Sequence, residues 1–351
     1  MSDEPLRYAV VGLGRAGWNI HVAQLRGRPD MRLIAVVDPV DDRREEAVAE
    51  FGCKAYDTYE PILAHDDVDV VVLATPSIGH ADESIRAMQA GKHVVVEKPM
   101  AMNVAEADAM LKTARRTHRE LFVNLSRRYG RMFTYVKQTL DSGLIGELFL
   151  IRCFVGGQFG RRNDWQTLRR QGGGELNNAG SHMLDVALAW LGRPIKRVLG
   201  QMRQIAAAGD VEDHVKCLLL ADNGAAIDLE ISRVEALDGA KPPEWTFCGT
   251  HGTMTLHGKE ATVRWFDPAE AAPLEVIDGA APNRRYGNDY QFPFQQKTEP
   301  AIGPEVESLY DNVYNVVRRR GRKVCDARSV RQMIRVMGMI RRGTDFQEPK
   351  P

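Results

Sequence analysis

The sequence has no excess of charge of either sign, no long apolar run and no internal repeat. Its 47 Lys and Arg residues equal its 47 Asp and Glu residues, so the formal net charge at pH 7 is +0. A balanced chain offers no positive field for nucleic acid or for an anionic membrane surface. No apolar run approaches the ~20 residues of a membrane-spanning helix. We therefore expect neither a nucleic-acid partner nor a membrane partner.

Clustered cysteines are also absent. The five cysteines lack C-x-x-C spacing, which excludes the common zinc-site pattern and a disulfide framework: Cys53, Cys153, Cys217, Cys248 and Cys325. No group of histidines and carboxylates has the spacing of a metal site either. The N-terminus, Met-Ser-Asp-Glu-Pro, is acidic and lacks the pattern of a signal peptide. We expect a cytoplasmic protein with reduced thiols and no bound metal.

What the sequence does have is a glycine-rich turn near its N-terminus. An apolar strand ends directly in Gly12-x-Gly14-x-x-Gly17, and the residues from Arg15 to Arg26 are predicted to be helical. Gly12 suits a tight turn, Gly14 lets the backbone approach a pyrophosphate, and Gly17 lets the helix pack closely on its strand. The pattern predicts a dinucleotide-binding turn at this point of the chain.

Three further residues complete the predicted dinucleotide site: Arg15, Ala16 and Asp38. Arg15 and Ala16 lie between the second and third glycines, where backbone amides at a helix N-terminus face the phosphates. Asp38 ends the next apolar run and is placed to accept a hydrogen bond from the adenosine ribose 2′-hydroxyl. The same charge would repel a 2′-phosphate, so we expect NAD rather than NADP. The alternative is a turn that uses glycine only for packing and an Asp that merely starts a loop.

Strand and helix patterns alternate as far as about residue 125. Six short apolar runs separated by helical patterns predict a doubly wound parallel sheet. The run over Val68–Ala74 is continuously apolar, as expected of a strand that is buried on both faces. Ligands bind beyond the carboxyl ends of such strands, where Thr75-Pro76 and Glu97-Lys98 fall, and these residues therefore join the predicted cofactor site.

The pattern changes after about Ser126. Helices are predicted over 131–142 and 178–191, on either side of a strand over 148–154 and a polar loop. Five later runs show approximate alternation and predict a mostly antiparallel sheet: 195–205, 213–220, 225–235, 244–256 and 261–266. Residues 267–303 predict a loop, and closing helices are expected over 304–319 and 327–341. We expect a Rossmann domain over 1–125 and an α+β substrate domain over 126–351, with the closing helices free to pack back on the first domain.

Four ordered motifs give the chain a family resemblance: Gly12-Leu-Gly-Arg-Ala-Gly17, Thr75-Pro76-Ser77-x-x-His80, Glu97-Lys98-Pro99 and Gly172-Gly-Gly-x-x-x-Asn178-x-x-x-His182-x-x-Asp185. Over nearly its whole length the chain resembles the Gfo/Idh/MocA oxidoreductases, the glucose–fructose oxidoreductase and inositol dehydrogenase group. The resemblance implies a Rossmann domain, NAD(P) as cofactor, and sugars or cyclitols as substrates. It also implies a C-terminal open sheet, through which a homodimer or homotetramer is expected to form.

Lys98 matches the family's catalytic lysine by position. A lysine at the carboxyl end of a buried strand, beside Glu97 and fixed by Pro99, is predicted to point into the crevice where a nicotinamide would lie. Its ammonium can hydrogen-bond a substrate hydroxyl and stabilise the alkoxide that forms as hydride leaves. The alternative is an exposed loop lysine. Members of the family often have a cis peptide bond before the proline of this motif.

The fourth motif places Asn178 and His182 one turn apart on one face of a predicted helix, with Asp185 on the same side. His182 is predicted to titrate near neutrality and to accept the proton of the oxidised hydroxyl, the alternative being a satisfied core histidine. The best-known family pattern has Asp where this chain has Asn178, and an amide can orient a group but cannot accept a proton. The chain therefore departs from plain inositol and glucose dehydrogenases and resembles members that oxidise uronates or glycosides at the 3-position.

Other residues are weaker candidates for the substrate crevice. At the start of the second domain these are Arg128 and Tyr129. In the polar loop before Gly172 they are Arg161, Trp165 and Arg169. A tryptophan can stack on a sugar ring and an arginine can clamp a carboxylate or phosphate, although a solvated loop is the equal alternative. His80 is expected to be structural or to line the crevice at the start of its helix.

The residues and the resemblance together predict an NAD-dependent oxidoreductase. Its substrate is expected to be a secondary hydroxyl of a sugar, sugar acid, glycoside or cyclitol, with Lys98 and His182 as the proton pair. Two alternatives stay open. One is a redox-neutral enzyme with tightly held NAD. The other is a non-catalytic dinucleotide or sugar sensor, against which the retained Lys98 and His182 argue.

Overall fold

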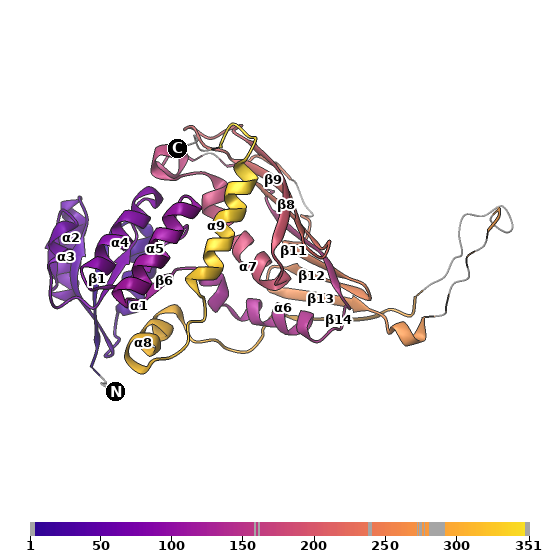
Figure 1. The fold of residues 1–351 in the computed structure, drawn as a ribbon, viewed down its shortest axis with the longest axis horizontal. Helices are drawn as coiled ribbons and strands as arrows, with labels where there is room; N and C mark the ends of the chain where they lie inside the picture. Colours follow the sequence, from indigo (N-terminus) through magenta and orange to yellow (C-terminus); the bar gives the residue numbers. More distant parts are fainter. Residues whose placement is uncertain are drawn as a thin grey trace.

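Residues 4–157, 159–160, 162–237, 241–271, 273, 276, 278–280 and 292–347 are described by the computed structural model of the protein. Two sheets, each covered by helices, lie side by side in that part of the chain (Figure 1). The N-terminal third forms the smaller sheet and its helices, and the larger sheet is built from the middle of the chain. None of the helices in these ranges is long and apolar enough to cross a membrane.

The smaller sheet has six parallel strands in the order β3-β2-β1-β4-β5-β6. These are β1 Leu6–Val11, β2 Met31–Val37, β3 Lys54–Tyr56, β4 Val70–Leu73, β5 His93–Val96 and β6 Leu121–Val123. The residues of β4 are wholly buried because helices cover both faces of the sheet. The strand order reverses between β1 and β4, so ligands are expected beyond the carboxyl ends of these strands. The predicted doubly wound sheet is confirmed.

Five helices cover the smaller sheet: α1 Ala23–Leu25, α2 Asp41–Phe51, α3 Glu60–Leu63, α4 His80–Gln89 and α5 Val104–Thr117. A 3-10 turn over Ser77–Gly79 leads into α4. The helix predicted over 15–26 is confirmed over 15–25, and most of it is a π-helical segment at Gly17–Val22, which continues briefly as α1. The glycine turn therefore leads into a wider helical turn than the sequence pattern suggested.

The larger sheet has eight strands in the order β14-β13-β12-β11-β7-β10-β9-β8. These are β7 Leu148–Val155, β8 Ile195–Arg203, β9 His214–Ala221, β10 Ala226–Ser232, β11 Trp245–Gly249, β12 Gly252–His257, β13 Glu260–Trp265 and β14 Gln295–Pro300. Only the β7–β10 pair is parallel, so the mostly antiparallel sheet is confirmed. β14 lies inside the stretch 267–303 that was expected to be a loop, and that expectation was wrong for these six residues.

Four longer helices belong to the second half: α6 Arg131–Asp141, α7 Ser181–Leu191, α8 Leu309–Arg319 and α9 Ala327–Arg341. Short 3-10 turns lie at Ser126–Tyr129, Trp165–Thr167, Arg169–Gln171 and Pro268–Glu270. The helix expected over 178–191 instead starts as a π-helical segment at Leu176–Gly180 before α7. The helix expected from residue 304 begins only at Leu309.

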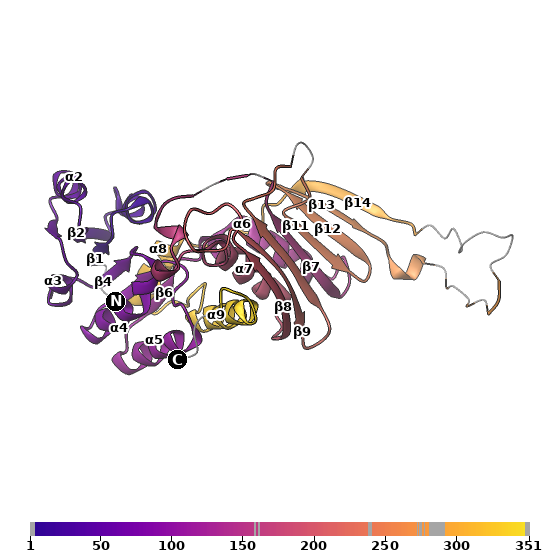
Figure 2. The ribbon, with the colours of Figure 1, turned by 90° about the horizontal axis from the view of Figure 1, so that it is seen from above.

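Helices cover one face of the larger sheet only. From above, α6, α7 and α9 lie on the face toward the smaller sheet, and no described element covers the other face (Figure 2). The inner face is held by aromatic packing, with the ring of Trp190 on α7 4.9 Å from that of Trp245 and 5.3 Å from that of Phe247. This packing fixes α7, and with it the start of the helix that carries His182.

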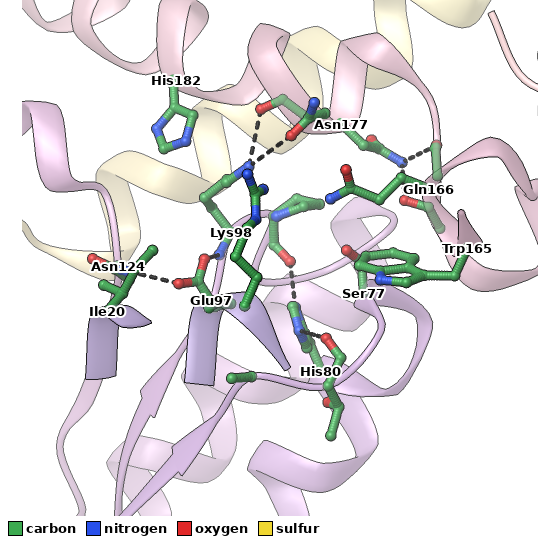
Figure 3. Close-up of a pocket in the computed structure, with 18 of the residues that line it drawn as sticks. Ile20, Ser77, His80, Glu97, Lys98, Asn124, Trp165, Gln166, Asn177 and His182 are labelled. Carbon is green, nitrogen blue, oxygen red and sulfur yellow. Dashed lines mark hydrogen bonds between the residues drawn. The ribbon is translucent and has the colours of Figure 1, made fainter. Parts of the chain in front are cut away.

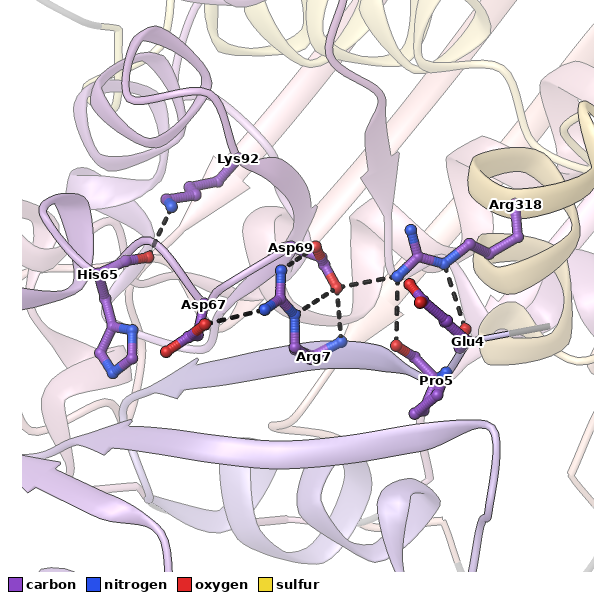
Figure 4. Close-up of polar contacts among 8 residues, drawn as sticks. All are labelled: Glu4, Pro5, Arg7, His65, Asp67, Asp69, Lys92 and Arg318. Carbon is purple, nitrogen blue, oxygen red and sulfur yellow. Dashed lines mark hydrogen bonds and ion pairs between the residues drawn. The ribbon is translucent and has the colours of Figure 1, made fainter. Parts of the chain in front are cut away.

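α8 returns to the first domain. Leu309, Tyr310 and Val313 belong to the same apolar cluster as Tyr8 and Val10 of β1. Polar contacts reinforce the packing, because Arg318 donates to the main-chain oxygens of residues 4 and 5 and to a carboxylate at the start of the central strands (Figure 4).

That carboxylate belongs to Asp69, which accepts hydrogen bonds from both Arg7 and Arg318. Burial would raise the pKa of Asp69, but the hydrogen bonds from Arg7 outweigh it, and the pKa is lowered. Arg7 also forms an ion pair with the largely exposed Asp67 (Figure 4). Helix α8 is thus joined to the central strands of the smaller sheet.

Candidate active site

The three glycines of the turn have different surroundings. A Cβ atom at Gly12 would lie 2.7 Å from the main-chain oxygen of Ala74, and Gly12 has a φ of +88°, so a side chain there is doubly excluded. A Cβ atom at Gly17 would lie only 1.8 Å from the main-chain oxygen of Gly12. At Gly14 a Cβ atom would have no neighbour within 4 Å. Gly12 and Gly17 serve close packing, whereas Gly14 borders open space that a ligand can approach.

Asp38 braces this turn. Its carboxylate accepts from the amide of Leu13 at 2.7 Å and from that of Val40 at 2.9 Å, and the side chain is almost fully buried. The guanidinium of Arg43 lies 3.4 Å from the same carboxylate and is about half exposed. The motif did not point to Arg43, which lies in the first turn of α2. Asp38 is therefore fixed beside the glycine turn, and Arg43 lies next to its carboxylate. The contact of Asp38 with a ribose stays a prediction.

A cavity of about 220 Å³ opens beyond the carboxyl ends of the first sheet's strands and under the start of α7 (Figure 3). It is lined by Arg15, Ala16, Ile20, Ala74, Thr75, Ser77, His80, Glu97, Lys98, Pro99, Asn124, Ser126, Trp165, Gln166, Gly172, Gly173, Gly174, Asn177, Asn178 and His182. Both halves of the chain contribute, so the cavity lies where the two sheets' layers meet.

Lys98 stands at the centre of this cavity. Its ammonium donates to the main-chain oxygen of Asn178 at 3.0 Å and lies 3.4 Å from the side-chain oxygen of the same residue. Burial lowers the pKa of Lys98, while the carboxylates of Glu97 and Glu175 act in the opposite direction. The Lys98–Pro99 peptide bond is cis. A buried ammonium with few partners is well suited to stabilise a negative charge on a ligand.

Glu97 holds the strand end beneath Lys98. One carboxylate oxygen lies 3.0 Å from Nε2 of His21 and accepts from Asn124 at 2.7 Å, and the other accepts from the amide of Lys98. Burial would raise the pKa of Glu97, but the contact with His21 outweighs it and the pKa is lowered to about 2. Nδ1 of His21 lies 2.8 Å from the hydroxyl of Tyr310, so a buried chain of polar groups joins α8 to the end of β5 beside Lys98.

His182 faces the cavity from the first turn of α7. Its Nδ1 atom is buried and has no hydrogen-bond partner among the described residues. Burial and the positive charges of Lys98 and Arg127 lower the pKa of His182 to about 3. The expectation of titration near neutrality is therefore corrected, because the ring sits in an apolar and positively charged setting. At neutral pH the imidazole is uncharged and has a lone pair or an N–H to offer to a ligand.

Other candidates line the cavity in different ways. The ring of His80 lies 2.8 Å from the main-chain oxygen of Pro99 and 3.0 Å from that of Thr75, so it holds two loops together. Trp165 is 38% exposed at the cavity's edge, where a ring could stack on it. Gln166, which the sequence did not single out, has a buried side-chain oxygen without a hydrogen-bond partner in the described chain.

Some candidates do not reach the cavity. Arg128 donates to both carboxylate oxygens of Asp185 at 2.7 and 2.9 Å, and both side chains are buried. The two residues were expected at the substrate, and they form an ion pair with each other instead because Asp185 lies on the inner face of α7.

Three further candidates lie away from the cavity. Tyr129 packs against the apolar core. Pro76 precedes the turn into α4 and does not line the cavity, whereas Arg169 is an exposed residue that contacts the C-terminal segment. Arg161 lies outside the described residues.

One group with metal-ligand geometry lies elsewhere. His214, Glu230 and Glu235 on the larger sheet have ligand atoms within 4.8 Å of one another. The ammonium of Lys216 lies 3.0 Å from Glu230 and already supplies a positive charge there.

Comparison with known proteins agrees with the geometry. Residues 6–125 match the oxidoreductase family with an NAD-binding Rossmann fold, and residues 133–255 match the GFO/IDH/MocA C-terminal domain. The chain belongs to the GFO/IDH/MocA family. It is an oxidoreductase with NAD as cofactor, which confirms the predicted family, enzyme class and cofactor.

Two curated relatives illustrate the range of this family. Inositol 2-dehydrogenase of Rhizobium meliloti (strain 1021) is 30% identical over 309 residues, which cover 87% of this chain and 87% of that protein. D-glucoside 3-dehydrogenase of Escherichia coli (strain K12) is 28% identical over 281 residues, which cover 73% of this chain and 78% of that protein. Among solved structures, an NAD-binding protein from Listeria innocua superposes with a TM-score of 0.80 at 26% identity, over 97% of this chain and 98% of that one.

Proposed function

We propose that the protein oxidises a secondary hydroxyl of a sugar, sugar acid, glycoside or cyclitol with NAD. Relatives named for inositol and for glucosides support this substrate range. The observation that carries the proposal is a single cavity, beside the glycine turn, that both Lys98 and His182 line (Figure 3).

The residues present fit NAD. The open space at Gly14 suits a pyrophosphate close to the backbone, and the carboxylate of Asp38 suits the adenosine ribose. When bound, NAD supplies the acceptor for the hydride that leaves the substrate carbon. The nicotinamide half would be held beside Lys98 by the residues around Thr75 and Glu97 at the ends of β4 and β5.

The protein's own groups handle the proton and the charge. The Lys98 ammonium donates to the substrate oxygen and stabilises the negative charge that develops as the hydride leaves. His182 is uncharged at neutral pH and accepts a hydrogen bond from the substrate hydroxyl at a ring nitrogen. It relays the hydroxyl proton rather than retaining it, because burial and the charge of Lys98 lower the pKa of His182 to about 3. Asn178 holds the ammonium through its main-chain oxygen and orients the substrate with its side chain. Burial of both groups keeps bulk water from competing for the same contacts.

A substrate panel tests the proposal. Purified protein with NAD is mixed with hexoses, glycosides, uronates and inositols, and the absorbance of reduced nicotinamide is followed. Turnover of at least one class is expected. If NAD binds but the complete panel gives no reduction, a non-catalytic sensor explains the protein better than a dehydrogenase.

We also propose a cellular compartment and an oligomeric state. All five cysteines are free thiols and four of them are buried, which supports the expectation of a reducing cytoplasmic setting.

The uncovered face of the larger sheet supports a homodimer or homotetramer. On that face Leu199 and Leu218 pair across β8 and β9 with side chains 75% and 39% exposed. Light scattering of wild type and of Leu199→Lys tests it, and a wild-type monomer would contradict it.

A further inference from the structure

A second cavity adjoins the first on the side of the larger sheet. It has a volume of about 510 Å³ and shares Arg15, Asn178 and His182 with the cavity around Lys98. Three more arginines line it, Arg127, Arg162 and Arg233, and none of the described residues that line it is an Asp or a Glu. The charged side chains that line the space next to the proposed reaction centre are therefore all arginines.

These arginines come from separate parts of the chain. Arg15 lies in the glycine turn, Arg127 follows β6, Arg162 lies in the loop after β7, and Arg233 follows β10. Guanidinium groups repel one another, and an anion among them reduces that repulsion. Their convergence on one cavity therefore favours an anionic ligand.

Each of the three outer arginines is held by one carboxylate. Arg127 contacts Glu244 at 3.1 Å and Arg162 contacts Asp164 at 3.0 Å. A guanidinium has five N–H donors, so each of these contacts leaves donors for a ligand.

Of the three arginines, Arg233 has the carboxylate contact without a hydrogen bond. Its Nε lies 3.2 Å from a carboxylate oxygen of Glu175, which is within ion-pair distance, but the two atoms are not aligned for a hydrogen bond. Nε is therefore a buried donor without a hydrogen-bond acceptor. A buried N–H in this state gains from a ligand oxygen.

The charges of these arginines reach the reaction centre. Arg127 is one of the groups that lower the pKa of His182, after burial and Lys98. Arg15 and Arg162 are among those that lower the pKa of Lys98, after burial. An anion among these arginines therefore lies close enough to be part of the same ligand that meets His182.

We propose that the substrate carries an anionic group, a carboxylate or a phosphate ester, which binds among Arg127, Arg162 and Arg233 while its reactive hydroxyl meets Lys98 and His182. This inference rests on the proposed function and narrows it from sugars in general to sugar acids or sugar phosphates. Arginine suits both anions because its planar donors match two oxygens at once. Neutral sugars leave the guanidinium groups without that partner.

Calorimetry on the protein loaded with NADH tests this inference without turnover, because the reduced cofactor cannot accept a hydride from the sugar. The probes are matched sets: a series of uronates, the corresponding sugar phosphates, and the neutral sugars of the same stereochemistry. At least one anion is expected to bind about 10- to 100-fold more tightly than its neutral counterpart. A preference for uronates over phosphates, or the reverse, identifies which anion the site takes. If no anion binds more tightly than its neutral counterpart, the inference is wrong.

Variants locate the anion. Arg127→Gln and Arg233→Gln are each expected to weaken binding of the preferred anion at least about tenfold more than binding of the neutral sugar. Arg233→Lys keeps the charge and is expected to recover part of the affinity. The matched control is Arg328→Gln, an exposed arginine of α9 paired with Asp326, which is expected to change nothing. Equal losses for anionic and neutral sugars in both Gln variants would contradict the assignment.

Turnover separates this inference from the proposed function. Oxidation of neutral sugars with no preference for anions would support the dehydrogenase and overturn the anion site. Selective binding of an anion that arginine variants abolish, without reduction of NAD by any sugar, would support the anion site and overturn the dehydrogenase.

Discussion

The ammonium of Lys98 lies 3.0 Å from the main-chain oxygen of Asn178, closer than the 3.4 Å to the side-chain oxygen of that residue. The π-helical segment Leu176–Gly180 thus presents its backbone to the lysine, a contact that the sequence motif did not indicate. The backbone therefore holds the ammonium whatever side chain stands at this position.

Replacing Asn178 should consequently be mild. Asn178→Ala keeps the main-chain contact and loses one side-chain hydrogen bond, so kcat/KM is expected to fall by no more than about tenfold. Lys98→Met removes the ammonium and is expected to lose about 10²–10⁴. Steady-state kinetics on both variants compare the two. Equal losses would show that the amide takes part in the chemistry itself.

Cofactor choice should depend on Asp38 and Arg43 together. Wild type is expected to prefer NAD because the Asp38 carboxylate repels a 2′-phosphate. Asp38→Ser should shift preference toward NADP without a second substitution, since Arg43 already lies 3.4 Å from the carboxylate.

The kcat/KM values for the two cofactors test this prediction. The double variant Asp38→Ser with Arg43→Ala is the control, and it should lose the gain in NADP activity. A wild-type preference for NADP would contradict the role given to this carboxylate.

The pH profile should lack an acid limb near neutrality. His182 accepts a proton only when neutral, and its pKa of about 3 leaves it neutral throughout ordinary assay conditions. Lys98 acts as an ammonium, so activity should be lost as pH rises through its pKa, which lies below the ordinary value of 10.5.

Measurement of kcat/KM for oxidation across pH 5–10 tests this profile. Activity that instead rises through the alkaline limb would make neutral Lys98 the base. His182→Asn separates the cases, because it should lower the rate without moving the alkaline limb.

Asp69 should contribute to stability. Its folded pKa is lowered, so its contribution is fully present above the unfolded pKa, near 3.9, and is lost as pH falls through the folded value. Asp69→Asn is expected to cost about 1.5–3 kcal/mol at pH 7, because it weakens contacts to both Arg7 and Arg318.

Urea unfolding measures the difference. The control is Asp67→Asn, an exposed partner of Arg7 at 3.0 Å, which is expected to cost less than about 1 kcal/mol. A similar loss for both variants would mean that the partial burial of Asp69 adds nothing to the free energy of unfolding.

Local patterns predicted most of the fold. Continuous apolar runs marked the buried parallel strands, and the helices predicted over 131–142 and 327–341 are found as α6 and α9. The strand β14 was missed because its residues are almost all exposed and show no alternation. The π-helical segment before α7 was missed because apolar spacing does not distinguish it from an α-helix.

The site was only partly predictable for a different reason. Arg15, Lys98 and His182 lie in motifs, so their places beside the cavity followed from local spacing and the family pattern. The pairing of Arg128 with Asp185 joins residues 57 positions apart, and no local signal could show that the two satisfy each other. The convergence of Arg127 and Arg233 likewise depends on how the larger sheet packs against the first domain.

The most direct test of the central claim is one pair of measurements on Lys98→Met. The dissociation constant for NAD and kcat/KM for the best substrate of the panel are determined on the same preparation. The structure predicts an almost unchanged dissociation constant, because the glycine turn and Asp38 are untouched, and a fall in kcat/KM of about 10²–10⁴. Near wild-type turnover in this variant would contradict the assignment of Lys98 and, with it, the proposed chemistry.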